Sequence, residues 1–182
     1  MSGTEARSYL LGSYLDRGQA YSRLGKRELA LADFQKSLEV DPTYALAYNQ
    51  LAWYLVTGRE PTKSDLELGV KHARRAVEIA PTVATPWNTL GVALYYSGQW
   101  REAIDSLQKS IELNTVSKRN PSSIDYFFLA MAHWQLKHNE EARKWYDQAV
   151  EWMEKDKSQD EELIRFRDEA TKLLNILPKS GN

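Results

Sequence analysis

The chain has 182 residues, of which 42% are hydrophobic and 27% are charged, and its formal net charge is −1. This composition is typical of a folded domain or a short repeat array and excludes a disordered charged tail. The balanced charge provides no overall field that would attract nucleic acid or an anionic membrane. Because the chain contains no cysteine, disulfides, thiolate nucleophiles and cysteine-ligated metal centres are excluded as well.

No apolar run approaches the roughly 20 residues that a membrane-spanning helix needs. The first seven residues lack the basic-then-apolar order of a secretory signal. We therefore expect a cytoplasmic protein without a membrane partner.

Similar residue types recur along the chain at intervals of 34 to 39 residues. Aromatic residues stand at Tyr14, Tyr48, Trp87 and Tyr126. Each is followed four positions later by a small residue: Gly18, Ala52, Gly91 and Ala130. A second series of small residues consists of Ala30, Gly69, Ala103 and Ala142. Such self-similarity indicates a repeat architecture, with units at about residues 11–44, 45–83, 84–122 and 123–156.

Each unit has the pattern of two helices joined by a turn. In the third unit, Trp87, Leu90, Gly91 and Leu94 are spaced as i, i+3, i+4 and i+7, which places them on one face of a helix. In the second unit, Ser64-x-x-Glu67 has the spacing of a capping box. It predicts that a helix begins near this serine.

The third unit resembles the tetratricopeptide repeat (TPR), through Trp87, Leu90-Gly91 and Leu94 and then Ala103 and Leu107. The resemblance implies an all-α fold, a right-handed superhelical solenoid of four helix hairpins, in a single domain over residues 1–182. The stretch from residue 127 to 166 is similar to bacterial repeat modules appended to serine/threonine kinase or WD-repeat chains. On that resemblance the chain would be an accessory module of a larger polypeptide.

A last amphipathic helix is predicted over about residues 159–177. Leu163, Phe166, Ala170, Leu173 and Leu174 lie on one stripe of it. A repeat array needs a cap over its last apolar face, and this helix is the natural candidate. The alternative is that it folds back into the concave groove of the array.

In a TPR array the first helix of each hairpin lines the concave side, and its positions outside the hairpin core form a groove stripe. This stripe becomes more aromatic toward the fourth unit, and large apolar side chains on a concave surface favour a partner site. We take ten stripe residues as the candidate peptide-binding groove: Asn49, Trp53, Asn88, Val92, Tyr95, Tyr96, Phe127, Phe128, Met131 and Trp134. The alternative is that some of them are core residues or are covered by the final helix.

Other classes of site are disfavoured. The positions that hold a terminal carboxylate in chaperone-binding TPR domains carry no cation here, so a chaperone C-terminus is not an expected ligand. The stripe has one arginine and no lysine, which disfavours nucleic acid. The three histidines, His72, His133 and His138, share no ligand spacing, so we expect neither a metal site nor a cofactor.

Catalytic motifs are also missing from the sequence, which has no phosphate loop, nucleophile elbow or kinase signature. We therefore expect no enzymatic activity. The predicted function is a protein- or peptide-binding scaffold, and the alternative is a self-association module that forms homo-oligomers, with its groove partly occluded by the final helix.

Overall fold

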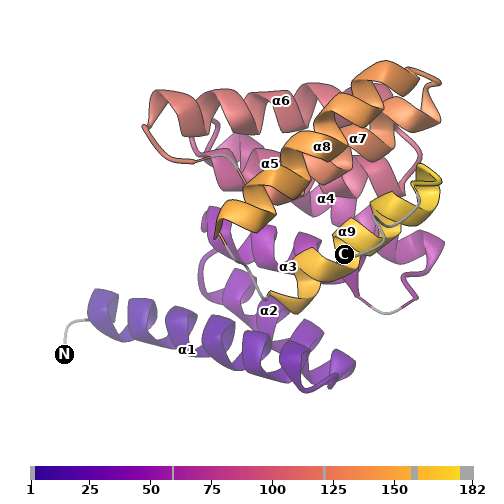
Figure 1. The fold of residues 1–182 in the computed structure, drawn as a ribbon. Helices are drawn as coiled ribbons and strands as arrows, with labels where there is room; N and C mark the ends of the chain where they lie inside the picture. The colour runs from indigo at the N-terminus through magenta and orange to yellow at the C-terminus, as the bar shows by residue number, and fades with distance from the viewer. Residues whose placement is uncertain (1–2, 59, 121, 157–159, 177–182) are drawn as a thin grey trace. The chain divides into compact units, whose positions relative to one another are not determined.

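In the computed structural model, the described residues are 3–58, 60–120, 122–156 and 160–176, and they form nine α-helices and no strand (Figure 1). In chain order these are α1 (Gly3–Arg23), α2 (Arg27–Val40), α3 (Ala45–Thr57), α4 (Lys63–Ile79), α5 (Ala84–Tyr96), α6 (Trp100–Val116), α7 (Ser123–Gln135), α8 (Asn139–Asp156) and α9 (Glu161–Leu173). The prediction of an all-α fold is confirmed over these residues. The predicted ends of the final helix, at 159 and 177, lie outside them.

The contacts of the chain divide it into two compact units, Met1–Thr89 and Leu90–Asn182. In the first unit α1 packs on α2, α3 packs on α4, and α2 joins the two hairpins by packing on α3. A cluster of buried apolar side chains fills the space between them: Leu15, Ala30, Phe34, Ala47, Leu51 and Leu55. Burial of these side chains is the main source of stability of the unit.

One ion pair also joins the two hairpins of the first unit. The Arg27 guanidinium, at the start of α2, lies 2.7 Å from the carboxylate of Asp65 in the first turn of α4. Both side chains are largely buried, and the Arg27 guanidinium also lies over the ring of Tyr54 in α3. The pair therefore fixes the beginnings of two second helices relative to one another.

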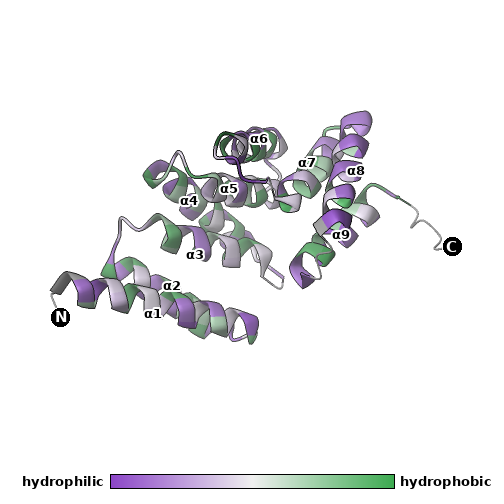
Figure 2. Ribbon diagram, turned by 60° about the vertical axis from the view of Figure 1, so that its left-hand side comes forward, coloured by the Kyte–Doolittle hydropathy of each residue, from purple (hydrophilic) through white to green (hydrophobic). Residues whose placement is uncertain are grey.

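In the second unit, α7 occupies the central position. It packs on α8 as its hairpin partner, on α6 of the preceding hairpin, and on α9, drawn in yellow in Figure 1. In Figure 2 the ribbon of α8 is mostly purple, because most of its residues are hydrophilic. Nine of the thirteen residues of α7 are buried.

The start of α4 differs from the sequence prediction. The capping box is formed by Thr62 and Asp65 rather than by Ser64 and Glu67. The Thr62 hydroxyl accepts from the Asp65 N–H at 3.1 Å, and the Asp65 carboxylate accepts from the Thr62 N–H at 2.9 Å. Because Arg27 of α2 also binds Asp65, the Thr62–Asp65 capping box is supported by a contact from another hairpin.

Small residues allow the two helices of a hairpin to approach closely. A Cβ built on Gly18 would lie 2.8 Å from the ring of Phe34, and one built on Gly91 would lie 2.5 Å from Leu107 Cγ. Both distances are shorter than atoms tolerate, so a side chain at either glycine would force the helices apart. Gly12 differs, since a Cβ there would meet no atom within 4 Å.

We predict that Gly91→Ala destabilises the protein by ~1–3 kcal/mol, the usual cost of overpacking a core. The matched control is Gly12→Ala, which adds the same methyl group to an open helical position and should stabilise by ~0.5–1 kcal/mol. Urea unfolding of both variants measures the two free energies. An unchanged or increased stability of Gly91→Ala would contradict the close approach described here.

Candidate functional site

The candidate groove residues of the second unit are largely buried. Val92, Phe127, Phe128 and Met131 are 0% exposed, and Tyr95 is 8% exposed. Tyr96 and Trp134 are half-buried. Phe127, Phe128 and Met131 are thus interior side chains in this structure rather than surface anchors.

Four aromatic rings from three helices form a cluster in this unit. Tyr95 and Tyr96 of α5 lie edge-on to Phe128 of α7, with ring centroids 5.3 and 5.5 Å away. Phe166 of α9 approaches the same ring at 4.9 Å. Edge-to-face pairs of this kind contribute ~0.5–1.5 kcal/mol each beyond the area that they bury. We name these four residues the aromatic cluster.

The final helix contacts the groove stripe directly. Its side chains Phe166, Ala170 and Leu174, spaced by four residues, are each 0% exposed. Asp160 caps the helix by accepting from the N–H groups of Glu162 and Leu163. In the second unit, α9 therefore covers the stripe positions around Phe128.

Two side-chain hydrogen bonds hold α9 in this place. The Tyr96 hydroxyl donates to Glu169 Oε2 at 2.8 Å. The hydroxyl oxygens of Tyr146 and Thr171 lie 2.7 Å apart. Because the Thr171 hydroxyl donates its proton to the Arg167 carbonyl, the Tyr146 hydroxyl is the donor to Thr171.

The environment of Glu169 favours its neutral form. Burial raises the pKa of Glu169 above its usual value, while the hydrogen bond from Tyr96 and the charge of Arg165 oppose this shift. Burial also raises the pKa of Tyr95 to about 12, with a further contribution from the Glu169 charge. Burial and the Glu169 charge raise the pKa of Tyr96 as well, so Tyr95 and Tyr96 are both neutral over the physiological range.

The groove stripe of the first unit carries two amide side chains and one tryptophan instead of a cluster of aromatic rings. Asn49 on α3 is 6% exposed, and its Oδ1 has no hydrogen-bond partner among the described residues. Trp53 on α3 and Asn88 on α5 are half-buried. A buried amide oxygen without a donor costs ~1–3 kcal/mol, and because this oxygen is inaccessible, Asn49 is an interior residue of the first unit rather than a contact point for a ligand.

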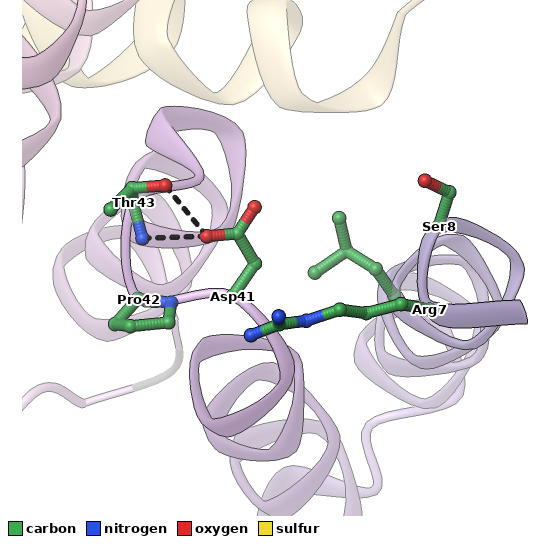
Figure 3. A pocket seen from close by; sticks show the side chains of 6 residues that line it. Arg7, Ser8, Asp41, Pro42 and Thr43 are labelled. Atoms are coloured by element: carbon green, nitrogen blue, oxygen red, sulfur yellow. Dashed lines mark hydrogen bonds between the residues drawn. The ribbon is translucent and has the colours of Figure 1, made fainter. Parts of the chain in front are cut away.

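A shallow cavity of about 460 Å³ lies between the start of α1 and the turn that follows α2 (Figure 3). Its polar groups are engaged with one another, because Thr43 donates twice to Asp41 and Arg7 donates to the Val40 carbonyl. These hydrogen bonds leave few polar groups to orient a ligand, and no candidate groove residue lines the cavity. Its lining residues are Arg7, Ser8, Leu11, Asp41, Pro42 and Thr43.

The structure also brings together two histidines that sequence spacing does not connect. Nδ1 of His133 lies 3.3 Å from Nδ1 of His138, across the turn between α7 and α8. The two residues are five apart in sequence and approach because Lys137 adopts a left-handed conformation with φ 66°. No glycine or asparagine marks this position, so the sequence carries no signal for it.

None of the described helices combines the length and the apolar character needed to cross a lipid bilayer.

Two sequence models of the family described as tetratricopeptide repeat match the chain, at residues 13–44 and 82–155. A curated relative, the type IV pilus assembly protein PilF of Pseudomonas aeruginosa, is 26% identical over 138 residues, which are 76% of this chain and 52% of the relative. The chain thus spans about half the length of this relative.

Solved structures show the same fold at low sequence identity. The PilF structure of Pseudomonas aeruginosa matches with a TM-score of 0.69 at 20% identity. The match covers 92% of the present chain and 70% of the PilF chain. MamA of Desulfovibrio magneticus matches with a TM-score of 0.63 at 22% identity. This match covers 86% of the present chain and 87% of the MamA chain. An O-GlcNAc transferase of Thermobaculum terrenum matches with a TM-score of 0.65 at 19% identity. This match covers 82% of the present chain and 26% of the transferase chain.

We predict that Phe166→Ala costs ~3–5 kcal/mol of stability, as expected for a buried phenylalanine. The loss should be accompanied by faster hydrogen exchange over α9, because the side chain connects this helix to Phe128. Lys172→Ala, at an exposed position of the same helix, is the control and should change neither quantity appreciably. Equal stabilities of the two variants would show that α9 is not held by the aromatic cluster.

A second prediction concerns pH. Because the folded-state pKa of Glu169 is raised, its contribution to stability is fully present below the unfolded value of ~4.3 and is lost as pH rises through the folded value. Glu169→Gln keeps an acceptor for Tyr96 but cannot ionise. The stability of the variant relative to wild type should therefore increase from pH 4 to pH 7. Thermal unfolding at both values tests this expectation, and a constant difference would contradict it.

Proposed function

This chain is built of tetratricopeptide repeats, and from that premise we propose that it is a non-catalytic scaffold that binds a protein or an extended peptide through its groove stripe. The candidate residues are divided between the two units, with Asn49, Trp53 and Asn88 in the first and the other seven in the second, and they have two roles. The buried ones, among them Phe127 and Met131, shape and support the surface. The half-buried Trp53, Asn88 and Trp134 are the side chains that we expect to contact a partner.

The proposal rests on the packing of α9 against α7. A stripe that pairs with an amphipathic helix through the contact of Phe166 with Phe128 has the apolar character to receive another polypeptide segment. Tryptophan and tyrosine are the residue types that concentrate binding energy in such surfaces.

The similarity to a pilus assembly protein favours a role in assembling a multiprotein complex. The predicted attachment to a larger chain, of the kind that carries a kinase or WD repeats, stays a prediction that fits such a role. The low identities of the structural relatives support the fold and leave the partner open.

Self-association is the second candidate function, and one observation favours it. The part of the stripe around Phe128 is already covered by the chain's own α9, so the remaining surface is smaller than a full TPR groove. Light scattering at two protein concentrations distinguishes the two functions. A mass that rises with concentration supports self-association, and a constant monomer mass supports binding of a different protein.

We predict that Trp53→Ala and Trp134→Ala each weaken capture of protein partners from a lysate of the source cells by ~2 kcal/mol, about 30-fold. The matched control is Val116→Ala, which removes an apolar side chain that is 74% exposed on α6, outside the stripe. Circular dichroism and melting temperature must show that all three variants are folded. Partners retained by both tryptophan variants but lost from the valine variant would contradict the proposal.

A further inference from the structure

The turn between α7 and α8 holds two imidazoles in a fixed arrangement. The His138 N–H donates to the His133 carbonyl at 3.0 Å, and the Lys137 N–H donates to the Trp134 carbonyl at 2.9 Å. These bonds, with the left-handed Lys137, close the end of α7 and carry the chain back over its last turn. The backbone therefore keeps the two side chains together before any ligand is present.

The ring nitrogens face one another. The two Nδ1 atoms are 3.3 Å apart, and the ring centroids are 5.5 Å apart with the planes inclined by 48°. In the absence of other groups, one neutral ring donates to the other across this distance. Nε2 of His133 is buried and has no hydrogen-bond partner among the described residues.

We propose that His133 and His138 form a binding site for a borderline divalent transition metal ion, with Zn²⁺ as the representative, held through their two Nδ1 atoms. Zinc binds histidine nitrogen at about 2.0–2.1 Å in tetrahedral geometry, which places two ligand nitrogens about 3.3–3.4 Å apart. The separation in the structure matches this value. Small rotations of the two rings are enough to direct both lone pairs at one ion.

The surroundings of His133 favour the neutral imidazole that a metal requires. Burial and the neighbouring His138 lower the pKa of His133, and the Glu141 carboxylate opposes this shift. Glu141 stands in the first turn of α8, beside Glu140. Its carboxylate also attracts a cation to this place.

Two protein ligands define the class of ion and the strength of the site. Over the part of the chain that the structure describes, no group of three or more His, Cys, Asp or Glu side chains is placed to hold a metal. Water must complete the coordination, so binding is weaker than at structural zinc sites with four protein ligands. Imidazole ligands select zinc, copper or nickel over magnesium, which prefers oxygen.

The test is a calorimetric titration of the full chain, without a histidine tag, with Zn²⁺ alone. Expected are one ion per chain and an affinity that falls by more than ~10-fold in His138→Ala, because loss of a ligand exceeds the usual loss from a supporting residue. His72→Ala removes the third histidine of the sequence, which packs against Tyr48 on α3. This control variant should bind as wild type does, and Mg²⁺ should not bind.

His138 is exposed, so its replacement should leave the fold intact, and circular dichroism checks this. His138→Gln provides a second variant that keeps a polar side chain and should also lose binding. The proposal is overturned if the wild-type chain takes up no zinc, if both His138 variants bind it as wild type does, or if His72→Ala alone abolishes uptake. Simultaneous shifts of the His133 and His138 ring resonances on zinc addition would support it independently.

Discussion

Paired helices approach closely at small residues, and this packing decides which face of each first helix is left for other contacts. The Phe34 ring fits over Gly18, and Leu107 fits over Gly91, at distances that leave no room for a Cβ. This packing uses one face of each first helix for its hairpin partner. Another face of the same helix is left to contact other elements, and it carries the groove stripe.

In the second unit that face is already in contact with α9. Phe166 lies against Phe128, and the Tyr96 hydroxyl binds Glu169. The contact combines apolar burial with a hydrogen bond to a carboxylate that burial disfavours in its charged form. The final helix thus covers the stripe positions around Phe128 on α7, and its role as a cap of the repeat array stays a prediction. Trp134, on the same helix as Phe128, is half-buried.

The sequence was sufficient to predict the helices and their pairing, because the spacing of aromatic and small residues is a local property of each hairpin. The sequence was not sufficient to predict that side chains of the stripe are buried. Phe128 is covered by a residue 38 positions later, and no local pattern indicates where the last helix packs. The helix α4 is capped by Thr62, two residues before the predicted Ser64, since Arg27 from another hairpin supports Asp65 as a capping residue. The approach of His138 to His133 depends on a left-handed residue that the sequence does not mark.

Binding of a protein at the groove stripe of the second unit can be measured by site-specific photo-crosslinking. A photoreactive amino acid is placed at Trp134 or, as a reference, at Val116, which is 74% exposed on α6, outside the stripe. We expect an adduct with a different protein from position 134 and none from position 116. Adducts from position 116 alone, or adducts from position 134 that contain only this chain's own α9, would show that the stripe is not the binding surface.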